Sequence, residues 1–150
     1  MNYTMKDKFY NYIQELQDTI TSKLEEVDGK AKFHEDIWKR LEGGGGRTRV
    51  IQNGNVFEKG GVNISGVHGK LPDSMQAYFE VEDADFFACG LSSVMHPKNP
   101  FAPTMHFNYR YFETDGGVWW FGGGTDITPS YINEEDMKHF HGTYKKVCDK

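Results

Sequence analysis

Long apolar segments are absent from this sequence of 150 residues. No stretch approaches the roughly 18 apolar residues that a helix needs to cross a bilayer. The first positions, MNYTMKDKFYNYIQELQD, alternate polar and apolar residues and lack the uninterrupted apolar core of a secretory signal. The sequence therefore predicts no membrane span and no secretory leader.

The chain also has few cysteines and no excess of positive charge. The chain has two cysteines, Cys89 and Cys148, far apart and without CxxC spacing, so we expect reduced thiols in a cytoplasmic protein. The formal net charge of -5 disfavours a general affinity for nucleic acid. With 150 residues the chain is long enough for one compact domain, and we take 1–150 as a single domain.

Glycine and aromatic residues are abundant, and the glycines cluster at 43–46 and 122–124. Such clusters indicate local backbone requirements rather than a generally flexible chain. The first cluster, GGGGRTRV, lacks the Lys-Ser/Thr of a phosphate-binding loop, and no helical pattern follows it. We interpret it either as a mobile loop that delivers Arg47 and Arg49 to an anionic partner or as a plain linker.

The periodicity of apolar residues changes along the chain. Three- and four-residue spacing from Met5 to Leu24 predicts an amphipathic helix, with Thr4 and Asp7 as a capping pair and Gly29 as its end. A second short helix is expected over 33–41. A last helix follows Asn133, which caps it. We expect its buried stripe to be formed by Met137, Phe140, Tyr144 and Val147.

Between these helices the pattern predicts strands. Asn53-Gly54 lies between two strand-like runs and is a strong hairpin signal, because both residues tolerate positive φ. The runs VNISGV, FFACGLSSVMH, TMHFNYRYFE and VWWFGGG read as further strands. Hairpin-like strands bounded by helices favour an α+β fold in which an antiparallel β-sheet is flanked by helices.

The run 104–112 carries a row of polar groups. Alternation places His106, Asn108 and Arg110 on one face and apolar or aromatic residues on the other. In the preceding strand Ser92 and His96 share a face, so neighbouring strands would line one cavity with all five side chains. A half-exposed strand facing solvent explains the same alternation equally well.

The run WWFGGGTDITP adds a carboxylate, Asp126, directly after three glycines. Glycines in a strand permit close backbone approach by a bulky ligand. Taken locally, Asp126 is better explained as a turn cap beside Gly and Pro. Trp119 and Trp120 face opposite ways in a strand, so one is a core candidate and the other a cavity candidate.

Histidines suggest a metal site only weakly. His139 and His141 lie two apart on a helix and cannot bind one metal together. His96, His106 and His141 form a set suited to imidazole-preferring ions, but nothing in the sequence brings them together. A histidine-based metal hydrolase is disfavoured because no HExxH or similar motif is present.

The order of five segments is more informative than any single motif. The segments WKRLEGGGGRTRV, VFEKGGVNISGVHG, GLSSVMHPKNPFAPTMHFNYRYF, WWFGGGTDITPSY and EEDMKHFHGTYKKVC resemble, in sequence order, the hallmark blocks of the oxygen-dependent coproporphyrinogen-III oxidase family. HPKNPFAPTMHFNYR and WWFGGGTDITP are highly specific. The resemblance runs from about residue 38 to the C-terminus and identifies the chain as the N-terminal portion of such an oxidase.

The resemblance implies a reaction and a fold. Members of this family use molecular oxygen to convert two propionates of coproporphyrinogen III to vinyl groups, which gives protoporphyrinogen IX in haem biosynthesis. They need no organic cofactor, and a requirement for a divalent metal such as manganese has been argued both ways. The family fold is an antiparallel sheet sandwiched between helices, and the enzyme is a homodimer.

The resemblance also implies residue roles. Ser92 and the run Asn108-Tyr109-Arg110 match substrate-contacting positions, and His106 matches a proton donor. His96, His106 and His141 match proposed metal ligands, and Asp126 matches an aspartate near the pyrrole nitrogens, which overrides its local explanation as a turn cap. We expect His106, Asp126 and Arg110 to be catalytic.

Charge supports this expectation. Four propionates require cations, which Arg110 together with Arg47, Arg49 or Lys59 would supply through charge-assisted hydrogen bonds. Family chains are roughly twice as long, so a truncated chain, a partial sequence or a split gene is expected. The alternative function is a tetrapyrrole- or metal-binding module without turnover.

Overall fold

The long first helix has the ends that the sequence predicts. The computed structural model describes residues 4–150, and α1 spans Met5–Asp28. Thr4 and Asp7 form a reciprocal capping box at its start, and Gly29 ends it in the left-handed conformation with φ 70°. A residue without a Cβ adopts that conformation at little cost, which explains why the helix stops there.

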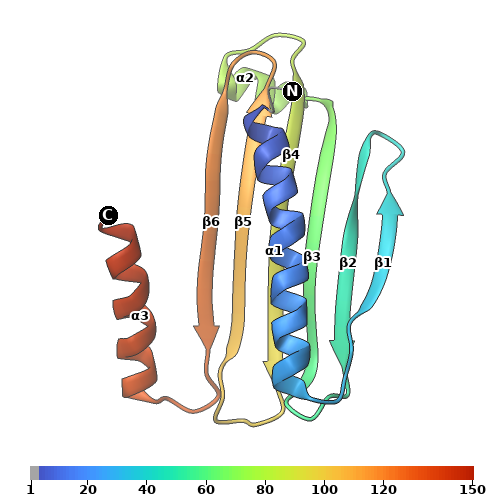
Figure 1. Ribbon diagram of the computed structural model, residues 1–150. Coiled ribbons are helices and arrows are strands. Elements are labelled where there is room, and N and C mark those ends of the chain that lie inside the picture. Colours follow the sequence, from blue (N-terminus) through green and yellow to red (C-terminus); the bar gives the residue numbers. More distant parts are fainter. Residues whose placement is uncertain (1–3) are drawn as a thin grey trace.

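A single antiparallel sheet forms the centre of the molecule. Its strand order follows the sequence, so each strand pairs with the next one along the chain. Figure 1 shows the six strands side by side, with α1 lying across one face of the sheet. The strands are β1 His34–Lys39, β2 Gly44–Gln52, β3 Phe57–Lys70, β4 Asp85–Pro97, β5 Thr104–Thr114 and β6 Trp119–Thr128.

The predicted hairpin at Asn53-Gly54 is confirmed, with a longer turn than the sequence suggested. Only Asn53 takes a positive φ, of 58°, and the turn extends to Val56 before β3 begins. The carboxylate of Asp28, at the end of α1, accepts hydrogen bonds from the backbone N–H groups of Asn55, Val56 and Phe57. Asp28 therefore fixes this turn to the end of the helix.

The helix predicted over 33–41 is wrong, because this segment forms the edge strand β1. Its partner β2 begins within the glycine cluster, and a Cβ at Gly46 would overlap the ring of Trp38 and the carbonyl of Ile64. Gly46 is thus required for close approach of neighbouring strands. Both interpretations of the cluster, a mobile loop and a linker, are also wrong, since Gly44–Gly46 belong to the sheet.

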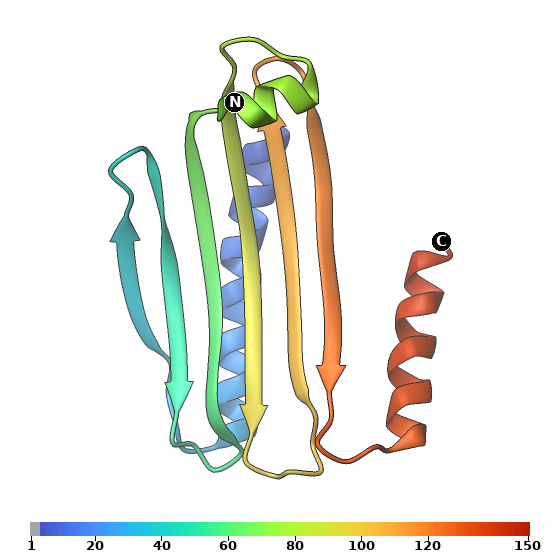
Figure 2. The same ribbon diagram turned by 180° about the vertical axis from the view of Figure 1, so that it is seen from behind.

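The two faces of the sheet differ in what covers them. On the α1 face, apolar side chains of the helix pack against β3, β4 and β5 around Ile13, which is fully buried. Within residues 4–150 the opposite face carries only the short helix α2, Asp73–Phe79, whose segment packs near Phe112 at one end of the sheet. Figure 2 shows this face with α2 across its upper end. Most of the face is therefore uncovered by the described chain.

The final helix, α3, spans Glu134–Cys148 and is capped by Asn133, whose side chain accepts hydrogen bonds from two backbone N–H groups. It stands beyond β6 in both views (Figures 1 and 2). The prediction of a buried stripe on α3 is wrong, because none of its residues is buried. Within residues 4–150 no element covers the apolar side of α3.

The α+β fold with an antiparallel sheet and flanking helices is confirmed. Within the described part of the chain, no helix combines the length and apolar character that crossing a bilayer requires.

Candidate functional site

The pairing of β4, β5 and β6 decides which side chains share a face. Ser92 lies opposite Asn108, and His106 lies opposite Asp126. Directly paired residues of antiparallel strands point to the same side, and alternate residues along one strand do so too. Ser92, His106, Asn108, Arg110 and Asp126 therefore all lie on the face opposite α1. The strand neighbours that the sequence only assumed are confirmed.

A hollow of about 590 Å³ opens on this face. Ser92, Asn108 and Arg110 line it on the polar side. Aromatic groups also line it, namely Trp38 of β1, Phe112 of β5 and Trp120 of β6. A cavity with apolar walls and a few converging polar groups is the usual form of a small-molecule site. The uncovered face thus offers both apolar surface and hydrogen-bonding groups to one ligand.

His106 and Asp126 form the closest polar pair on this face. The Nδ1 atom of His106 lies 2.9 Å from Oδ2 of Asp126, and Thr128 Oγ1 donates to Asp126 Oδ1 at 3.5 Å. A carboxylate that accepts from one imidazole nitrogen leaves the other, Nε2, free to give or take a proton. The pair is partly exposed, as expected for groups that meet a ligand from solvent.

Arg110 is available to bind an anion. In the described part of the chain its guanidinium takes part in no ion pair or side-chain hydrogen bond, although it borders the hollow. An arginine binds a carboxylate bidentately through its planar fork of N–H donors. Arg110 therefore supplies the hollow with a cation that no carboxylate within residues 4–150 neutralises.

The glycines of β6 divide between the two faces. Gly122 and Gly124 lie opposite Arg110 and Asn108, on the face of the hollow, and Gly123 lies opposite Tyr109 on the α1 face. A Cβ at Gly124 would meet only the amide of Asn108, at 3.9 Å, so the fold does not require glycine there. A Cβ at Gly123 would press against the Asn108 carbonyl. Gly124 thus keeps open a space beside the hollow that the chain itself does not use.

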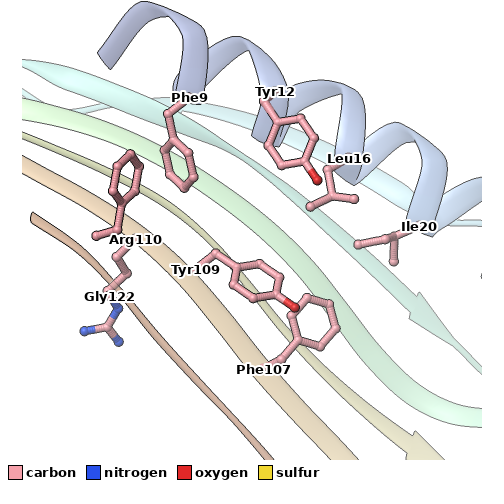
Figure 3. Close-up of a pocket in the computed structure, with 9 residues that line it drawn as sticks. Phe9, Tyr12, Leu16, Ile20, Phe107, Tyr109, Arg110 and Gly122 are labelled. Carbon is pink, nitrogen blue, oxygen red and sulfur yellow. The ribbon is translucent and has the colours of Figure 1, made fainter. Parts of the chain in front are cut away.

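Tyr109 lies apart from the other predicted substrate contacts. Its side chain is on the α1 face, where it borders a second pocket of about 360 Å³ between α1 and β5. Figure 3 shows Tyr109 with Phe107 in this pocket, facing Leu16 and Ile20 of the helix, while the guanidinium of Arg110 points away. Burial raises the pKa of Tyr109. The structure therefore does not bring the Tyr109 side chain to the hollow.

The three histidines proposed as metal ligands are not brought together. His96 and His106 lie on neighbouring strands of the hollow's face, and His96 Nδ1 lies 3.4 Å from Thr104 Oγ1. His141 is exposed on α3, beyond β6. No group of three His, Cys, Asp or Glu residues within 4–150 has the arrangement of a metal site. These residues do not fit a metal in the arrangement that this part of the chain adopts.

Arg47 and Arg49 do not serve the hollow, so the expectation that they bind the propionates is wrong. Both lie on the α1 face, and both bind Asp18 of α1, at 2.8 and 2.7 Å. Arg49 also pairs with Glu35 of β1. Their charges are satisfied within the chain, where they join the outer strands to the helix.

Sequence reasoning missed part of the hollow's lining. Trp38 was assigned to a helix, yet it lies on β1 and its indole N–H donates to Thr48 Oγ1 at 3.3 Å. Asn63, on β3 opposite Ser92, was not singled out. The alternation of Thr48 with Arg47 and Arg49 was a usable signal for the hollow. It places Thr48 on the sheet face of the hollow and the two arginines on the α1 face. Trp120 borders the hollow, as one of the two tryptophans was expected to do, but Trp119 is 62% exposed and is no core residue.

Comparisons with known proteins show the family to which the chain belongs. A family model described as Coproporphyrinogen III oxidase matches residues 8–150. A Glycine max protein named oxygen-dependent coproporphyrinogen-III oxidase, chloroplastic, is 54% identical over 98% of this chain. Coproporphyrinogen-III oxidase 1, chloroplastic, of Arabidopsis thaliana is 51% identical over 98% of the chain. The oxygen-dependent coproporphyrinogen-III oxidase of a Prochlorococcus marinus strain is 53% identical over 97% of it.

The matched relatives are longer than this chain. It covers 42% of the Glycine max and Arabidopsis thaliana proteins and 43% of the Prochlorococcus marinus protein. The chain thus spans less than half the length of these relatives, and what the remaining part contributes lies outside the structure.

Proposed function

The chain belongs to the coproporphyrinogen III oxidase family, and from this premise we propose that the full-length protein oxidatively decarboxylates two propionates of coproporphyrinogen III to vinyl groups. The product is protoporphyrinogen IX, and molecular oxygen is the co-substrate. The single observation that carries the proposal is the shared face of Arg110, Asn108, Ser92 and the His106–Asp126 pair beside one hollow.

Substrate binding follows from the hollow's chemistry. Arg110 binds a propionate bidentately, and the hydroxyl of Ser92 and the amide of Asn108 offer further hydrogen bonds. Trp38, Phe112 and Trp120 provide apolar surface for the hydrocarbon part of the macrocycle. Gly124 leaves the strand backbone open to close approach by a bulky ring, whereas the ring of Trp120 lies against Gly122. We propose that Tyr109 contributes through its backbone, since its side chain faces α1.

The His106–Asp126 pair provides proton transfer. Asp126 stabilises positive charge that develops on an electron-rich pyrrole, or accepts the proton of its N–H group. His106, oriented by Asp126, exchanges a proton with the reacting propionate or with reduced oxygen. Partial exposure of both groups in this part of the chain leaves room for the macrocycle to cover them.

The proposed reaction balances without an organic cofactor. Each propionate loses carbon dioxide from its carboxylate and a hydrogen from the carbon next to the ring. The two electrons released from each propionate reduce one oxygen molecule, which takes up two protons and becomes hydrogen peroxide. One of these protons comes from the substrate carbon and one from solvent through His106. Two turnovers therefore consume two oxygen molecules per macrocycle.

The proposed reaction uses no resident metal. A manganese site made of His96, His106 and His141 would require α3 to move from its place beyond β6. Elemental analysis of the purified full-length protein by mass spectrometry tests for a bound metal directly.

We also propose that the full-length protein is a cytoplasmic homodimer. Within residues 4–150, Cys89 and Cys148 form no disulfide, in keeping with a reducing compartment. Exposed apolar groups on β6 and α3 offer surface for a partner subunit or for the rest of the chain. Light scattering of the purified protein tests whether it is a dimer. Imaging of a fluorescent fusion tests whether it is cytoplasmic. A chloroplast location, as in the names of the plant relatives, is the alternative outcome.

The activity is tested with purified full-length protein, coproporphyrinogen III and oxygen. We expect protoporphyrinogen IX as the product by chromatography, with two oxygen molecules consumed per product. Binding of coproporphyrin under anaerobic conditions without any turnover in air would instead favour a tetrapyrrole-binding module. Failure both to bind and to react would contradict both functions.

A further inference from the structure

The lysines and arginines of the sheet are distributed unequally between its faces. All six strands lie within the described residues, and their pairing places only two such residues, Lys59 and Arg110, on the face opposite α1. Lys39, Arg47, Arg49 and Lys70 lie on the other face, where all but Lys39 pair with carboxylates. The face of the hollow thus has two cations at separate places.

Lys59 has no acidic partner in the described part of the chain. Its ammonium takes part in none of the ion pairs found within residues 4–150, and its side chain is exposed. It lies opposite His96 at the end of β3, beside a depression of about 410 Å³ that Gln52, Asn53 and Glu58 also border. An unpaired ammonium on a polar depression is available to bind an anion.

The two cations lie at different levels of the same sheet face, Lys59 near one end of the strands and Arg110 near their middle. Lys59 pairs with His96, whereas Arg110 pairs with Gly90, six residues earlier on β4. At the rise of a β-strand this corresponds to about 20 Å along the sheet, and β3 and β5 are about 10 Å apart across it. Along the strand direction, Ser92, Asn108 and the His106–Asp126 pair lie at levels between those of Lys59 and Arg110.

We propose that Lys59 is a positioning residue that binds a substrate carboxylate at the opposite end of the macrocycle from Arg110. This inference rests on the proposed function. A macrocycle with four propionates around its rim presents carboxylates in several directions, and one cation fixes only one edge. Two cations on either side of the His106–Asp126 pair define which propionate lies beside that pair.

The arrangement also predicts selectivity by carboxylate number. A ligand with carboxylates on opposite edges engages Lys59 and Arg110 together, whereas one with both carboxylates on a single edge engages only one of them. Charge-assisted hydrogen bonds to carboxylates are strong enough for this difference to be measured. Lys59 therefore discriminates tetracarboxylate from dicarboxylate macrocycles.

The test uses the full-length protein with Lys59→Met, Lys59→Arg and the control Lys23→Met, an exposed lysine on α1. We expect Lys59→Met to raise the KM for coproporphyrinogen III about tenfold with a much smaller change in kcat. We expect Lys59→Arg to restore most of the loss and Lys23→Met to have no effect. Anaerobic fluorescence titrations with coproporphyrin and mesoporphyrin IX should show that Lys59→Met weakens binding of the tetracarboxylate more.

The outcomes separate this inference from the proposed function. If the unmodified protein neither binds coproporphyrin nor turns over coproporphyrinogen, the proposed function fails, and the inference fails with it. If the unmodified protein is active but Lys59→Met has the same KM and the same ligand preference as Lys23→Met, only the role of Lys59 is overturned. The role of Lys59 is also overturned if Lys59→Met changes kcat but not KM, or if Lys59→Arg does not restore the KM.

Discussion

The imidazole of His106 and the carboxylate of Asp126 lie 2.9 Å apart across the β5–β6 pair. This contact joins two residues that are separated in the sequence by most of β5, a turn and most of β6. It places a carboxylate-bound imidazole beside the row formed by Ser92, Asn108 and Arg110. The chemistry of the uncovered face depends on this pair.

Replacing Asp126 should lower the turnover rate much more than it weakens ligand binding. In the full-length protein we expect Asp126→Ala to lower kcat by about 10²- to 10⁴-fold, the usual contribution of a positioned acid–base group. The dissociation constant for coproporphyrin should change far less, because Arg110 and the apolar walls remain. Steady-state kinetics and fluorescence titration measure the two quantities. Glu82→Ala, an exposed carboxylate outside the site, serves as the control, and equal kcat in the two variants would remove Asp126 from the chemistry.

A methyl group at Gly124 tests whether a ligand occupies the space beside the hollow. The added Cβ would meet only the Asn108 amide, at 3.9 Å, so Gly124→Ala should leave the free energy of unfolding unchanged or raise it by about 0.5–1 kcal/mol. We expect KM to rise several-fold, since in the proposed site the methyl group would point at the macrocycle. Urea denaturation and steady-state kinetics provide the two measurements.

Gly142→Ala is the matched control for this change, because a Cβ at Gly142 on α3 meets nothing within 4 Å. Its KM should equal that of the unmodified protein. If Gly124→Ala binds substrate as well as Gly142→Ala does, no ligand uses the space that Gly124 leaves open.

Asp28 makes stability depend on pH. Backbone N–H groups of Ala31, Phe57, Asn55 and Val56 hold the pKa of Asp28 well below its ordinary value of 3.8. A carboxyl with a lower pKa in the folded state contributes stability above its unfolded pKa and loses it as the pH falls through the folded one. We expect Asp28→Asn to lower the urea midpoint at pH 7, and the difference from the unmodified protein to shrink below about pH 4.

The exposed Asp36 of β1 provides the control for Asp28, as Asp36→Asn should leave the urea midpoint nearly unchanged at both pH values. A constant difference between Asp28→Asn and the unmodified protein from pH 7 to pH 3 would show that the carboxylate charge does not hold the turn.

Cys89 should be chemically inert in the folded protein. Burial on the α1 face raises the pKa of its thiol to about 12, and only the thiolate reacts readily with alkylating reagents. At pH 8 we expect no alkylation of Cys89 by iodoacetamide, and rapid alkylation after unfolding in urea. Peptide mapping by mass spectrometry measures both. Rapid modification of Cys89 without denaturant would contradict its burial.

Local signals in the sequence predicted the elements whose ends are set by neighbouring residues. The capping box of Thr4 and Asp7, the left-handed Gly29 and the cap at Asn133 all act within one helical turn, and all three are confirmed. The alternation of His106, Asn108 and Arg110 likewise gave their common face. Such features depend on short-range geometry that a sequence displays directly.

Other features depend on contacts between distant residues. The segment of Trp38 has a composition that suits a helix, yet pairing with β2 makes it a strand. Arg47 and Arg49 were expected near the substrate, but their register on β2 turns them toward Asp18 of α1. The short helix α2 was missed, because it has no side-chain cap and no long apolar stripe. Register and face become fixed only when the sheet assembles.

Anaerobic titration of the full-length protein with coproporphyrin, with and without Arg110→Gln, measures whether the face opposite α1 binds a carboxylate-bearing macrocycle through Arg110. Arg40→Gln, at the turn after β1, provides the control. We predict that Arg110→Gln raises the dissociation constant at least tenfold, a loss of about 1.4 kcal/mol, while Arg40→Gln leaves it unchanged. Equal affinity in the unmodified protein and both variants would contradict the account.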